Sequence, residues 1–469
     1  MKVVIIGGGP GGYTAAVRSA QNGFETTLIE KANLGGTCLN WGCIPSKIFR
    51  RSADFADDLK KSARLGFALE HLPTISMDVL QARKENILSS QRKGIASLLA
   101  HHNVTVLSGD AVIGKENSVV VTVEDGSVVT VPYDKLIVAT GSTPVNIPAF
   151  PFDSENVLSS NDVLGLQDVP ESAIIVGGGV VGCEFAFILS ALGTKVTVVE
   201  ALDRVLSLPG IEKASSKVIE ISMKKHGIRL LTKKLVRSVT PKDGTCVVDV
   251  ASTDTEQDQV TTLEAQKVIV VVGRAPATKE LGIEEVGVEL SRGFIPVSET
   301  MQTANPDIYA IGDVAWAPGK AMLAHVASTE AGIAVEAIAG GNRAMSYRAV
   351  PSGIFTAPEV GNVGMTEEEA KQQGIAATSA KVLFRTLGKV QVLGELDGHA
   401  IVTVEEGSGN ILGVQLVGAH ATDLIAEAGI LVEKKMTLHD VCDTIHAHPT
   451  VSEIMLEVCL KAAGTPLHG

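Results

Sequence analysis

Residues 3–12, which read VVIIGGGPGG, decide the fold. Four apolar residues predict a buried strand, and the glycine run after them predicts a turn into a helix over about residues 13–22. A second apolar strand, residues 26–29, ends in Glu30, which lies 23 residues after Gly7. A strand, a G-x-G-x-x-G turn, a helix and a second strand ending in an acid form a Rossmann βαβ unit.

Each glycine of this motif, and the acid after it, has a physical purpose. Gly7 makes the strand-to-helix turn, Gly9 lets the backbone approach a pyrophosphate, and Gly12 lets the helix pack on the strand. The helix N-terminus then presents N–H groups to the phosphates, and Glu30 can accept hydrogen bonds from a ribose. The segment therefore predicts a dinucleotide site.

The chain contains the same unit a second time. Residues 173–176 form its strand, Gly177, Gly179 and Gly182 its glycine turn, and Glu200 its acid, again 23 residues after the first glycine. A single G-x-G-x-x-G is weak evidence, whereas two complete copies strongly predict two dinucleotide sites. The alternative, two glycine-rich turns with solvated glutamates, is much less favoured.

The second acid also indicates the cofactor. A carboxylate at Glu200 would repel the 2′-phosphate of NADP, so we expect NAD at this site. Arg204 is the nearby cation that could serve a 2′-phosphate, and we expect it to be solvated instead.

Composition excludes several classes of protein. The 469 residues suggest about three domains at roughly 150 residues each. A net charge of −13 and an aromatic content of 4% argue against nucleic-acid binding. The N-terminus lacks the pattern of a signal peptide, and we see no apolar stretch long enough to span a membrane. We therefore expect a cytoplasmic protein, in which closely spaced cysteines are catalytic or metal-binding.

One cysteine pair is closely spaced. Cys38 and Cys43 have four residues between them, and we find no second pair with the spacing of metal ligands. From spacing alone, a redox pair and a pair of free structural thiols are about equally plausible. The position just after a dinucleotide unit favours a redox pair, because a dithiol beside an electron carrier can exchange two electrons as a disulfide. We interpret the other four as small buried apolar residues: Cys183, Cys246, Cys442 and Cys459.

Residues 35–47, GGTCLNWGCIPSK, resemble the active-site motif of the flavin disulfide reductases, most closely that of the dihydrolipoamide dehydrogenase branch. The resemblance covers essentially the whole chain. Further matching segments are 136–142 (LIVATGS), 272–274 (VGR), 303–313 (ending IYAIGD), 322–325 (MLAH) and 446–453 (HAHPTVSE).

The resemblance implies an α/β fold with two Rossmann-like dinucleotide-binding domains and a C-terminal α+β dimerisation domain, in a homodimer. The implied domains are 1–150 for FAD, 151–275 for NAD, 276–347 as a central segment completing the FAD domain, and 348–469 for dimerisation.

It also implies which residues bind the two cofactors. For FAD they are Gly7, Gly9, Gly12, Glu30, Gly36, Thr37, Lys47, Ala111, Thr140, Gly141, Asp313, Met322, Leu323, Ala324 and His325. For NAD they are Gly177, Gly179, Gly182, Glu184, Glu200 and Gly273. No metal is expected.

The resemblance assigns the catalytic roles as well. Cys38 would exchange with substrate and Cys43 would contact the flavin, while Lys47 would lie near the flavin and pair with Glu184. His448 would be the general base and Glu453 would orient it, since the thiolate is the attacking species. In the family this His–Glu pair reaches into the partner subunit's active site. His446 is expected to be structural or solvated, without a catalytic role.

The implied reaction is oxidation of a dihydrolipoyl group by NAD⁺. The implied partner is a lipoyl-carrying protein or acyltransferase of a 2-oxo acid dehydrogenase or glycine cleavage system. Two alternatives stay open: an NAD(P)H-dependent reductase of another disulfide, and a non-catalytic flavoprotein scaffold in a complex. Glutathione reductase fits poorly because of Glu200, and mercuric reductase because the C-terminus has no cysteine pair. A soluble transhydrogenase fits poorly because it needs no reactive disulfide.

Overall fold

The computed structural model describes residues 1–254 and 260–468. The chain forms two compact units, each assembled from separate stretches of sequence. Unit 1 comprises Met1–Ile48, Ser76–Val145 and Gly273–Tyr347, and unit 2 comprises Phe49–Ile75, Asn146–Val272 and Arg348–Gly469.

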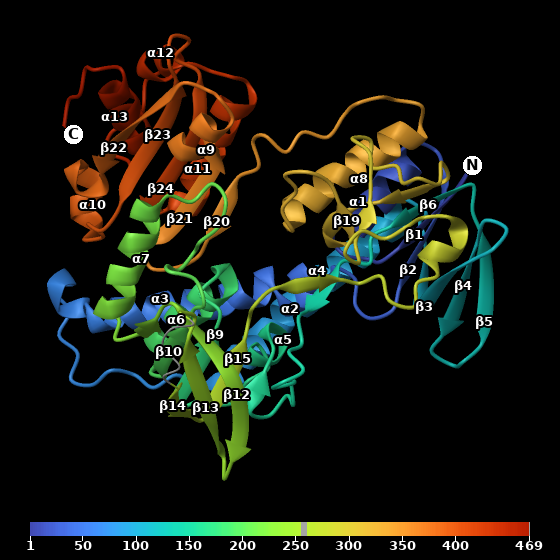
Figure 1. Cartoon of the computed structure of the whole chain (residues 1–469), viewed down its shortest axis with the longest axis horizontal. Coiled ribbons are helices and arrows are strands. Elements are labelled where there is room, and N and C mark those ends of the chain that lie inside the picture. The colour runs from blue at the N-terminus through green and yellow to red at the C-terminus, as the bar shows by residue number, and fades with distance from the viewer. Residues whose placement is uncertain (255–259, 469) are drawn as a thin grey trace. The chain divides into compact units, whose positions relative to one another are not determined.

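A seven-stranded sheet forms the centre of unit 1, with the strand order β18-β6-β1-β2-β3-β4-β5 (Figure 1). Strand β1 pairs in parallel with β2 on one side and β6 on the other, whereas β3, β4 and β5 form an antiparallel meander. The strands are β1 (Lys2–Ile6), β2 (Glu25–Glu30), β3 (Thr105–Gly114), β4 (Ser118–Val123), β5 (Val128–Pro132), β6 (Lys135–Val138) and β18 (Ile308–Ala310).

Alternation along β1 gives this sheet two apolar faces. Val3 and Ile5 pack in a core with apolar residues of the helices, and Val4 and Ile6 pack in a second core with those of the meander. The helices of this unit are α1 (Pro10–Gln21), α2 (Gly36–Trp41), α4 (Met77–His101) and α8 (Ala324–Ile338), with the start of α3 (Cys43–Lys60). Smaller elements are β7 (Ser142–Pro144), β16 (Arg274–Pro276), β17 (Ile295–Pro296), β19 (Ala315–Trp316), η2 (Ile283–Val286) and η3 (Gly312–Val314).

Unit 2 repeats the same parallel arrangement. Strand β9 lies between β10 and β15, as β1 lies between β2 and β6, in the order β11-β10-β9-β15-β8. This part contains β8 (Val157–Leu158), β9 (Ser172–Val176), β10 (Lys195–Val199), β11 (Arg229–Leu231), β15 (Lys267–Val270), α5 (Ser160–Val163), α6 (Val180–Leu192) and α7 (Lys213–Lys225). An antiparallel sheet follows, made of β12 (Lys234–Lys242), β13 (Thr245–Ser252) and β14 (Val260–Ala265). The two βαβ repeats confirm the expected α/β class.

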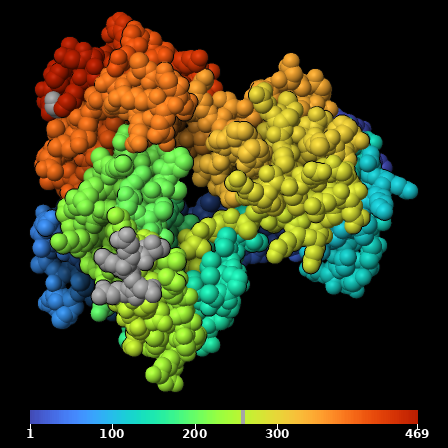
Figure 2. All heavy atoms as spheres, viewed as in Figure 1, coloured from blue at the N-terminus to red at the C-terminus, as the bar shows by residue number. Residues whose placement is uncertain are grey.

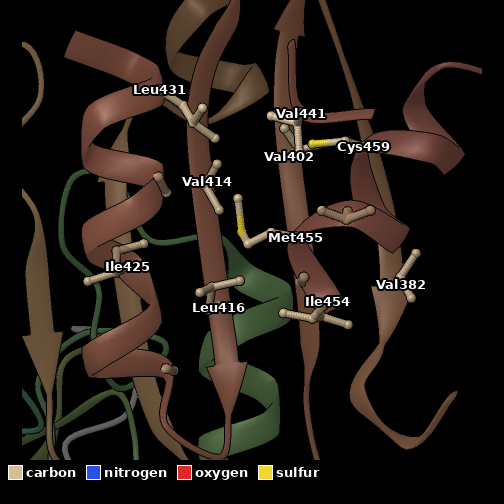
Figure 3. Close-up of a cluster of buried hydrophobic side chains, with 14 of the residues drawn as sticks. Val382, Val402, Val414, Leu416, Ile425, Leu431, Val441, Ile454, Met455 and Cys459 are labelled. Carbon is tan, nitrogen blue, oxygen red and sulfur yellow. The ribbon is translucent and has the colours of Figure 1, made fainter. Parts of the chain in front are cut away.

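The C-terminal part of unit 2 is an antiparallel sheet in the order β20-β21-β24-β23-β22. Side chains such as Val402, Val414 and Leu416 pack against Ile425 and Met455 of two helices (Figure 3). The elements are β20 (Ser352–Ile354), β21 (Glu359–Gly364), β22 (Ala377–Leu383), β23 (His399–Glu405), β24 (Ile411–Gly418), η4 (Phe384–Thr386), α9 (Glu367–Gln372), α10 (Gly388–Leu393), α11 (Ala421–Glu433), α12 (Leu438–Cys442) and α13 (Glu453–Ala462), with η1 (Ser62–Leu65) earlier in the chain.

The opposite face of this sheet is also covered. Ser215 Oγ donates to Gln415 Oε1 at 3.1 Å and lies 3.3 Å from His399 Nε2. The backbone N–H of Glu212, at the N-cap of α7, donates to the same Gln415 oxygen at 2.8 Å. Helix α7 therefore packs on the polar face of the sheet, where the green and orange surfaces meet in Figure 2. Within the described residues, no helix is long and apolar enough to cross a membrane.

Candidate active site

A disulfide joins Cys38 and Cys43, the pair singled out by its spacing. Cys38 lies in the short helix α2 and Cys43 is the first residue of α3. Their Cα atoms are 4.6 Å apart. Cys38 is half-buried and Cys43 is exposed. The break between the two helices thus presents a disulfide that a thiolate can reach.

Asn40, between the two cysteines, fixes this turn. Its side-chain amide donates to Gly36 O at 2.9 Å and to Leu34 O at 3.1 Å, and its Oδ1 accepts from Arg92 Nη1 at 3.0 Å. Arg92 belongs to α4 and also forms an ion pair with Glu85. The sequence analysis missed this contact because Asn40 and Arg92 are 52 positions apart and share no motif.

The first glycine turn forms a cradle that fits a dinucleotide. A Cβ on Gly12 would lie 1.7 Å from Gly7 O, so the helix can approach the strand only without a side chain. At Gly9 a Cβ would find its nearest neighbour 3.8 Å away, at Gly36 Cα, which leaves room for a phosphate. Glu30 accepts from the Gly8 N–H at 2.6 Å and therefore lies at this turn, where a ribose would bind.

The second glycine turn has the same geometry. A Cβ on Gly182 would lie 1.9 Å from Gly177 O, and a Cβ on Gly179 would have nothing within 4 Å. Glu200 accepts from the Gly178 N–H at 2.5 Å and from the Leu202 N–H at 2.7 Å. The donor set and open space of both turns fit a bound dinucleotide, one in each unit.

The expectation that Arg204 is solvated is wrong. Its Nη1 donates to Ser216 Oγ at 2.5 Å and to Leu206 O at 3.3 Å, and its Nη2 donates to Ile211 O at 3.2 Å. The loop after Glu200 supplies the two carbonyl acceptors, and Ser216 belongs to α7. Arg204 is therefore held between its own loop and α7 and does not offer a free cation for a 2′-phosphate.

Asp313 belongs to a hydrogen-bonded group in unit 1. Its Oδ2 accepts from Ser142 Oγ at 2.6 Å, and Ser142 Oγ accepts from Arg274 Nε at 2.7 Å. Burial lowers the pKa of the Arg274 guanidinium, although the Asp313 charge opposes the shift. Ser142 and Arg274 were both within segments of family resemblance, but neither was singled out as a site residue.

Most of the residues expected to bind FAD belong to the same unit as these groups. Thr140 Oγ1 donates to Ala277 O at 2.7 Å, beside β7 and β16, and Leu323 is the N-cap of α8. Ala111 lies in β3 and packs against the core of unit 1. The others of the FAD set lie in unit 1: Thr37, Lys47, Gly141, Met322, Ala324 and His325. Of the NAD set, Gly273 lies in unit 1 and the rest in unit 2.

His448 and Glu453 form a pair in unit 2. His448 Nδ1 lies 2.8 Å from Glu453 Oε1, and the Thr450 N–H donates to Glu453 Oε2 at 2.9 Å. Burial raises the pKa of Glu453, but the Thr450 N–H and the His448 ring outweigh it and leave the pKa below its usual value. The carboxylate therefore stays charged at neutral pH and holds Nδ1, so Nε2 is the atom that can take up a proton. The His448 side chain is 76% exposed.

Other candidates have different surroundings. His446 Nε2 lies 3.2 Å from Glu427 Oε1 and its side chain is 6% exposed, which fits the structural role expected for it. Glu184 Oε1 accepts from the Phe355 N–H at 3.0 Å. Glu184 belongs to unit 2 and Lys47 to unit 1, so their pairing stays a prediction.

The remaining cysteines match their expected role with one exception. Three are buried: Cys183, Cys246 and Cys459. Cys442 is only half-buried, because it is the last residue of the short helix α12. Among the described residues, no three His, Cys, Asp or Glu side chains are grouped so as to hold a metal ion.

Comparison with known proteins gives consistent results along the chain. The family model for pyridine nucleotide-disulphide oxidoreductases matches residues 1–331, and that for their dimerisation domain matches residues 350–459. Dihydrolipoyl dehydrogenase of Geobacillus stearothermophilus is 39% identical over 469 residues, covering 100% of this chain and 97% of the relative. That of Bacillus subtilis is 38% identical over 468 residues, covering 99% and 97%. The crystal structure of LpdA from Mycobacterium tuberculosis is similar with a TM-score of 0.91 and 28% identity, covering 98% and 99% of the two chains.

Proposed function

Because the chain belongs to the pyridine nucleotide-disulphide oxidoreductase family, we propose that it is a homodimeric flavoenzyme that oxidises dihydrolipoyl groups and reduces NAD⁺ to NADH. This activity is the one for which its full-length relatives are named. The observation that carries the proposal is the Cys38–Cys43 disulfide, in the same unit as the Gly7–Gly12 cradle. A second glycine cradle in unit 2 supplies the other nucleotide site.

Two cofactors supply the electron transfer. FAD, when bound, accepts an electron pair from the reduced cysteines, and NAD⁺ is the final hydride acceptor. In this proposal the Gly7–Gly12 cradle, Glu30 and Asp313 hold FAD, and the Gly177–Gly182 cradle with Glu200 holds NAD. The engaged Arg204 and the carboxylate of Glu200 both favour NAD over NADP.

The cysteines carry the exchange with substrate. A substrate thiolate attacks Cys38 Sγ, so that a substrate–Cys38 disulfide forms and the Cys38–Cys43 bond breaks, leaving Cys43 as a thiolate. The second substrate thiol then displaces Cys38, which closes the substrate disulfide and leaves both cysteines reduced. Two electrons have then moved from the substrate to the cysteine pair.

His448 removes the thiol proton that would block the attack. Glu453 holds Nδ1 at 2.8 Å, so the proton is taken up at Nε2. The charged carboxylate also stabilises the imidazolium that results. In the homodimer we place this pair at the partner subunit's disulfide, so that each site uses both chains.

The substrate that fits this chemistry is a dithiol on a carrier, whose two thiols can close a ring as a disulfide. We propose a lipoyl-carrying protein or acyltransferase of a 2-oxo acid dehydrogenase or glycine cleavage system, met in the cytoplasm. The other functions considered, reduction of a different disulfide and a scaffold without catalysis, have no observation that favours them.

The test is the initial rate of NADH formation by FAD-replete protein given dihydrolipoamide and NAD⁺. We expect rapid turnover, and Cys43→Ser should abolish it while leaving FAD bound. If the wild-type protein binds FAD and forms its disulfide but gives no NADH, the proposed substrate is wrong. NADH formation that survives in Cys43→Ser would exclude the disulfide route.

A further inference from the structure

A buried ion pair lies beside Asp313 and has no role in the mechanism above. Lys320 forms an ion pair with Glu330 of α8, and the two side chains are 5% and 0% exposed. Tyr347 OH donates to the same carboxylate oxygen, Glu330 Oε1, at 2.7 Å. We call Lys320, Glu330 and Tyr347 the Glu330 triad.

The other oxygen of Glu330 reaches the segment that carries Asp313. The Gly312 N–H donates to Glu330 Oε2 at 2.7 Å. Gly312 has a φ of +71°, in the left-handed region that residues with a side chain rarely adopt, and it begins the 3₁₀ turn η3 (Gly312–Val314). The triad therefore holds the backbone immediately before Asp313 through the Gly312 N–H.

Lys320 and Tyr347 together compensate the buried charge of Glu330. A fully buried carboxylate is costly unless a cation and hydrogen-bond donors compensate it. Lys320 supplies the cation: burial lowers its pKa, and Glu330 and Asp313 act in the opposite direction. Burial together with the Glu330 charge raises the pKa of Tyr347, so its hydroxyl stays a proton donor at neutral pH. Without Lys320, Glu330 would be a buried, uncompensated charge and would no longer hold Gly312 in the same way.

We propose that the Glu330 triad is a positioning element for FAD, which holds the Gly312 N–H and thereby presents the Asp313 carboxylate to the ribityl hydroxyls, the part of FAD that the family resemblance assigns to this aspartate. This inference rests on the assignment of Asp313 to FAD in the proposed function. It makes a specific prediction, because the adenosine and pyrophosphate end of FAD would be held by a different part of unit 1, the Gly7–Gly12 cradle with Glu30. Loss of the triad should weaken binding at one end of the cofactor and spare the other.

The test compares FAD with ADP as ligands of the full-length protein freed of flavin. Titration calorimetry should show FAD bound at least about 10-fold more weakly by Lys320→Met, and about 3-fold more weakly by Tyr347→Phe, which loses one hydrogen bond and keeps the ion pair. The affinity for ADP should stay within about 2-fold of wild type in both. Lys135→Met is the matched control, because Lys135 Nζ also pairs with a carboxylate of unit 1, Asp307, at 2.5 Å. It should change neither affinity.

Three results would overturn the proposal. One is an unchanged FAD affinity in both triad variants. Another is an equal loss of FAD and ADP affinity, which would mean that the triad only stabilises unit 1. The third is the same selective loss in Lys135→Met. If Lys320→Met does not fold, Tyr347→Phe decides between these outcomes.

Asp313→Ala separates this proposal from the assignment on which it rests. It should weaken FAD binding at least about 10-fold and spare ADP. If it does so while the triad variants bind FAD normally, the triad proposal is wrong and the flavin assignment stands. If Asp313→Ala has no effect, the assignment of Asp313 is wrong and the triad proposal falls with it. The NADH assay tests the overall function independently of both.

Discussion

The His448–Glu453 pair illustrates how an exposed side chain can be held in one orientation. The histidine ring is 76% exposed, but its Nδ1 faces a carboxylate that is itself 21% exposed and bonded to the Thr450 N–H. The ring is thereby fixed from one side, and Nε2 remains available for a substrate proton. The chemistry at this position depends on two residues that lie five positions apart.

Replacement of His448 should therefore affect turnover far more than folding. We expect His448→Gln to lower turnover with dihydrolipoamide at least ~100-fold, the lower end for loss of a general base. The readout is the rate of NADH formation at saturating substrate, with flavin content and melting temperature measured on the same sample. His439→Gln is the control, because His439 is 83% exposed and pairs with Asp443 at the exposed end of α12. Near-normal turnover in His448→Gln would exclude it as the base.

At the scale of elements, the two strand–turn–helix units share the same glycine geometry. In each unit, the third glycine of the motif lies against the carbonyl oxygen of the first glycine. A Cβ added to the third glycine would lie 1.7 Å from that oxygen in one unit and 1.9 Å from it in the other. An added Cβ on the middle glycine would meet no atom closer than 3.8 Å in the first unit and none within 4 Å in the second. The close contact at the third glycine is a requirement of folding. The space at the middle glycine is a requirement of ligand binding.

Two alanine substitutions in the second unit should separate these requirements. Gly179→Ala places its methyl group where the pyrophosphate approaches, so we expect a normal melting temperature and NAD⁺ bound at least about 10-fold more weakly. Gly182→Ala forces a backbone clash, so we expect a destabilised or insoluble protein, with a loss of about 2 kcal/mol or more in the free energy of unfolding. Thermal melts and NAD⁺ titrations check both. Equal melting temperatures for the two variants would contradict the distinction.

Local motifs made much of the fold and of the candidate site predictable from sequence. The features that could not be predicted depend on contacts between residues far apart in the chain. The βαβ units and the cysteine pair could be predicted because their residues are joined by short, regular spacings. Arg204 was wrongly expected to be solvated, because no sequence periodicity shows that the loop after Glu200 and Ser216 of α7 supply its acceptors. The same holds for Arg92 on Asn40 and for the Glu330 triad, whose members lie 10 and 17 positions from Glu330. Side chains that meet only after folding leave no pattern in the sequence.

At the scale of whole units, a buried polar layer joins the two parts of unit 2. His399 is 3% exposed and lies 3.3 Å from Ser215 Oγ of α7. Burial lowers the pKa of His399 to about 4, and the Lys381 charge on β22 adds to the shift. The folded protein therefore keeps this ring neutral at a pH where an unfolded chain protonates it.

The pH dependence of stability follows from this difference. In the folded protein the pKa of His399 lies below its ordinary value of 6.5. The contribution of the neutral ring to the free energy of unfolding is therefore complete above pH 6.5. It is lost as the pH falls towards 4, by about 1.4 kcal/mol per pH unit at most. We expect His399→Gln to lose less stability than wild type between pH 7 and pH 5. Chemical unfolding at several pH values measures this, and the difference between the two proteins removes the effects of other groups. Parallel pH profiles would contradict it.

The homodimer gives a test of the shared site at the largest scale. We combine Cys43→Ser and His448→Gln chains, each with its own affinity tag, and purify the mixed dimers. If each site draws its cysteines and its histidine from different chains, one of the two sites is intact, and turnover should be about half of wild type. If each site lies within one chain, both sites are damaged and the mixed dimer should be as inactive as its parents.

The placement of the cysteines has a practical consequence for work in living cells. Three of the six thiols are shielded in the interior, Cys442 is half-buried, and the disulfide pair has a half-buried and an exposed member. An alkylating reagent added to the native protein should therefore mark an oxidised chain at Cys442 and a reduced chain at Cys38 as well, because the family resemblance places Cys43 against the flavin. The mass of the intact polypeptide then reports how many molecules were carrying electrons when the cells were broken open.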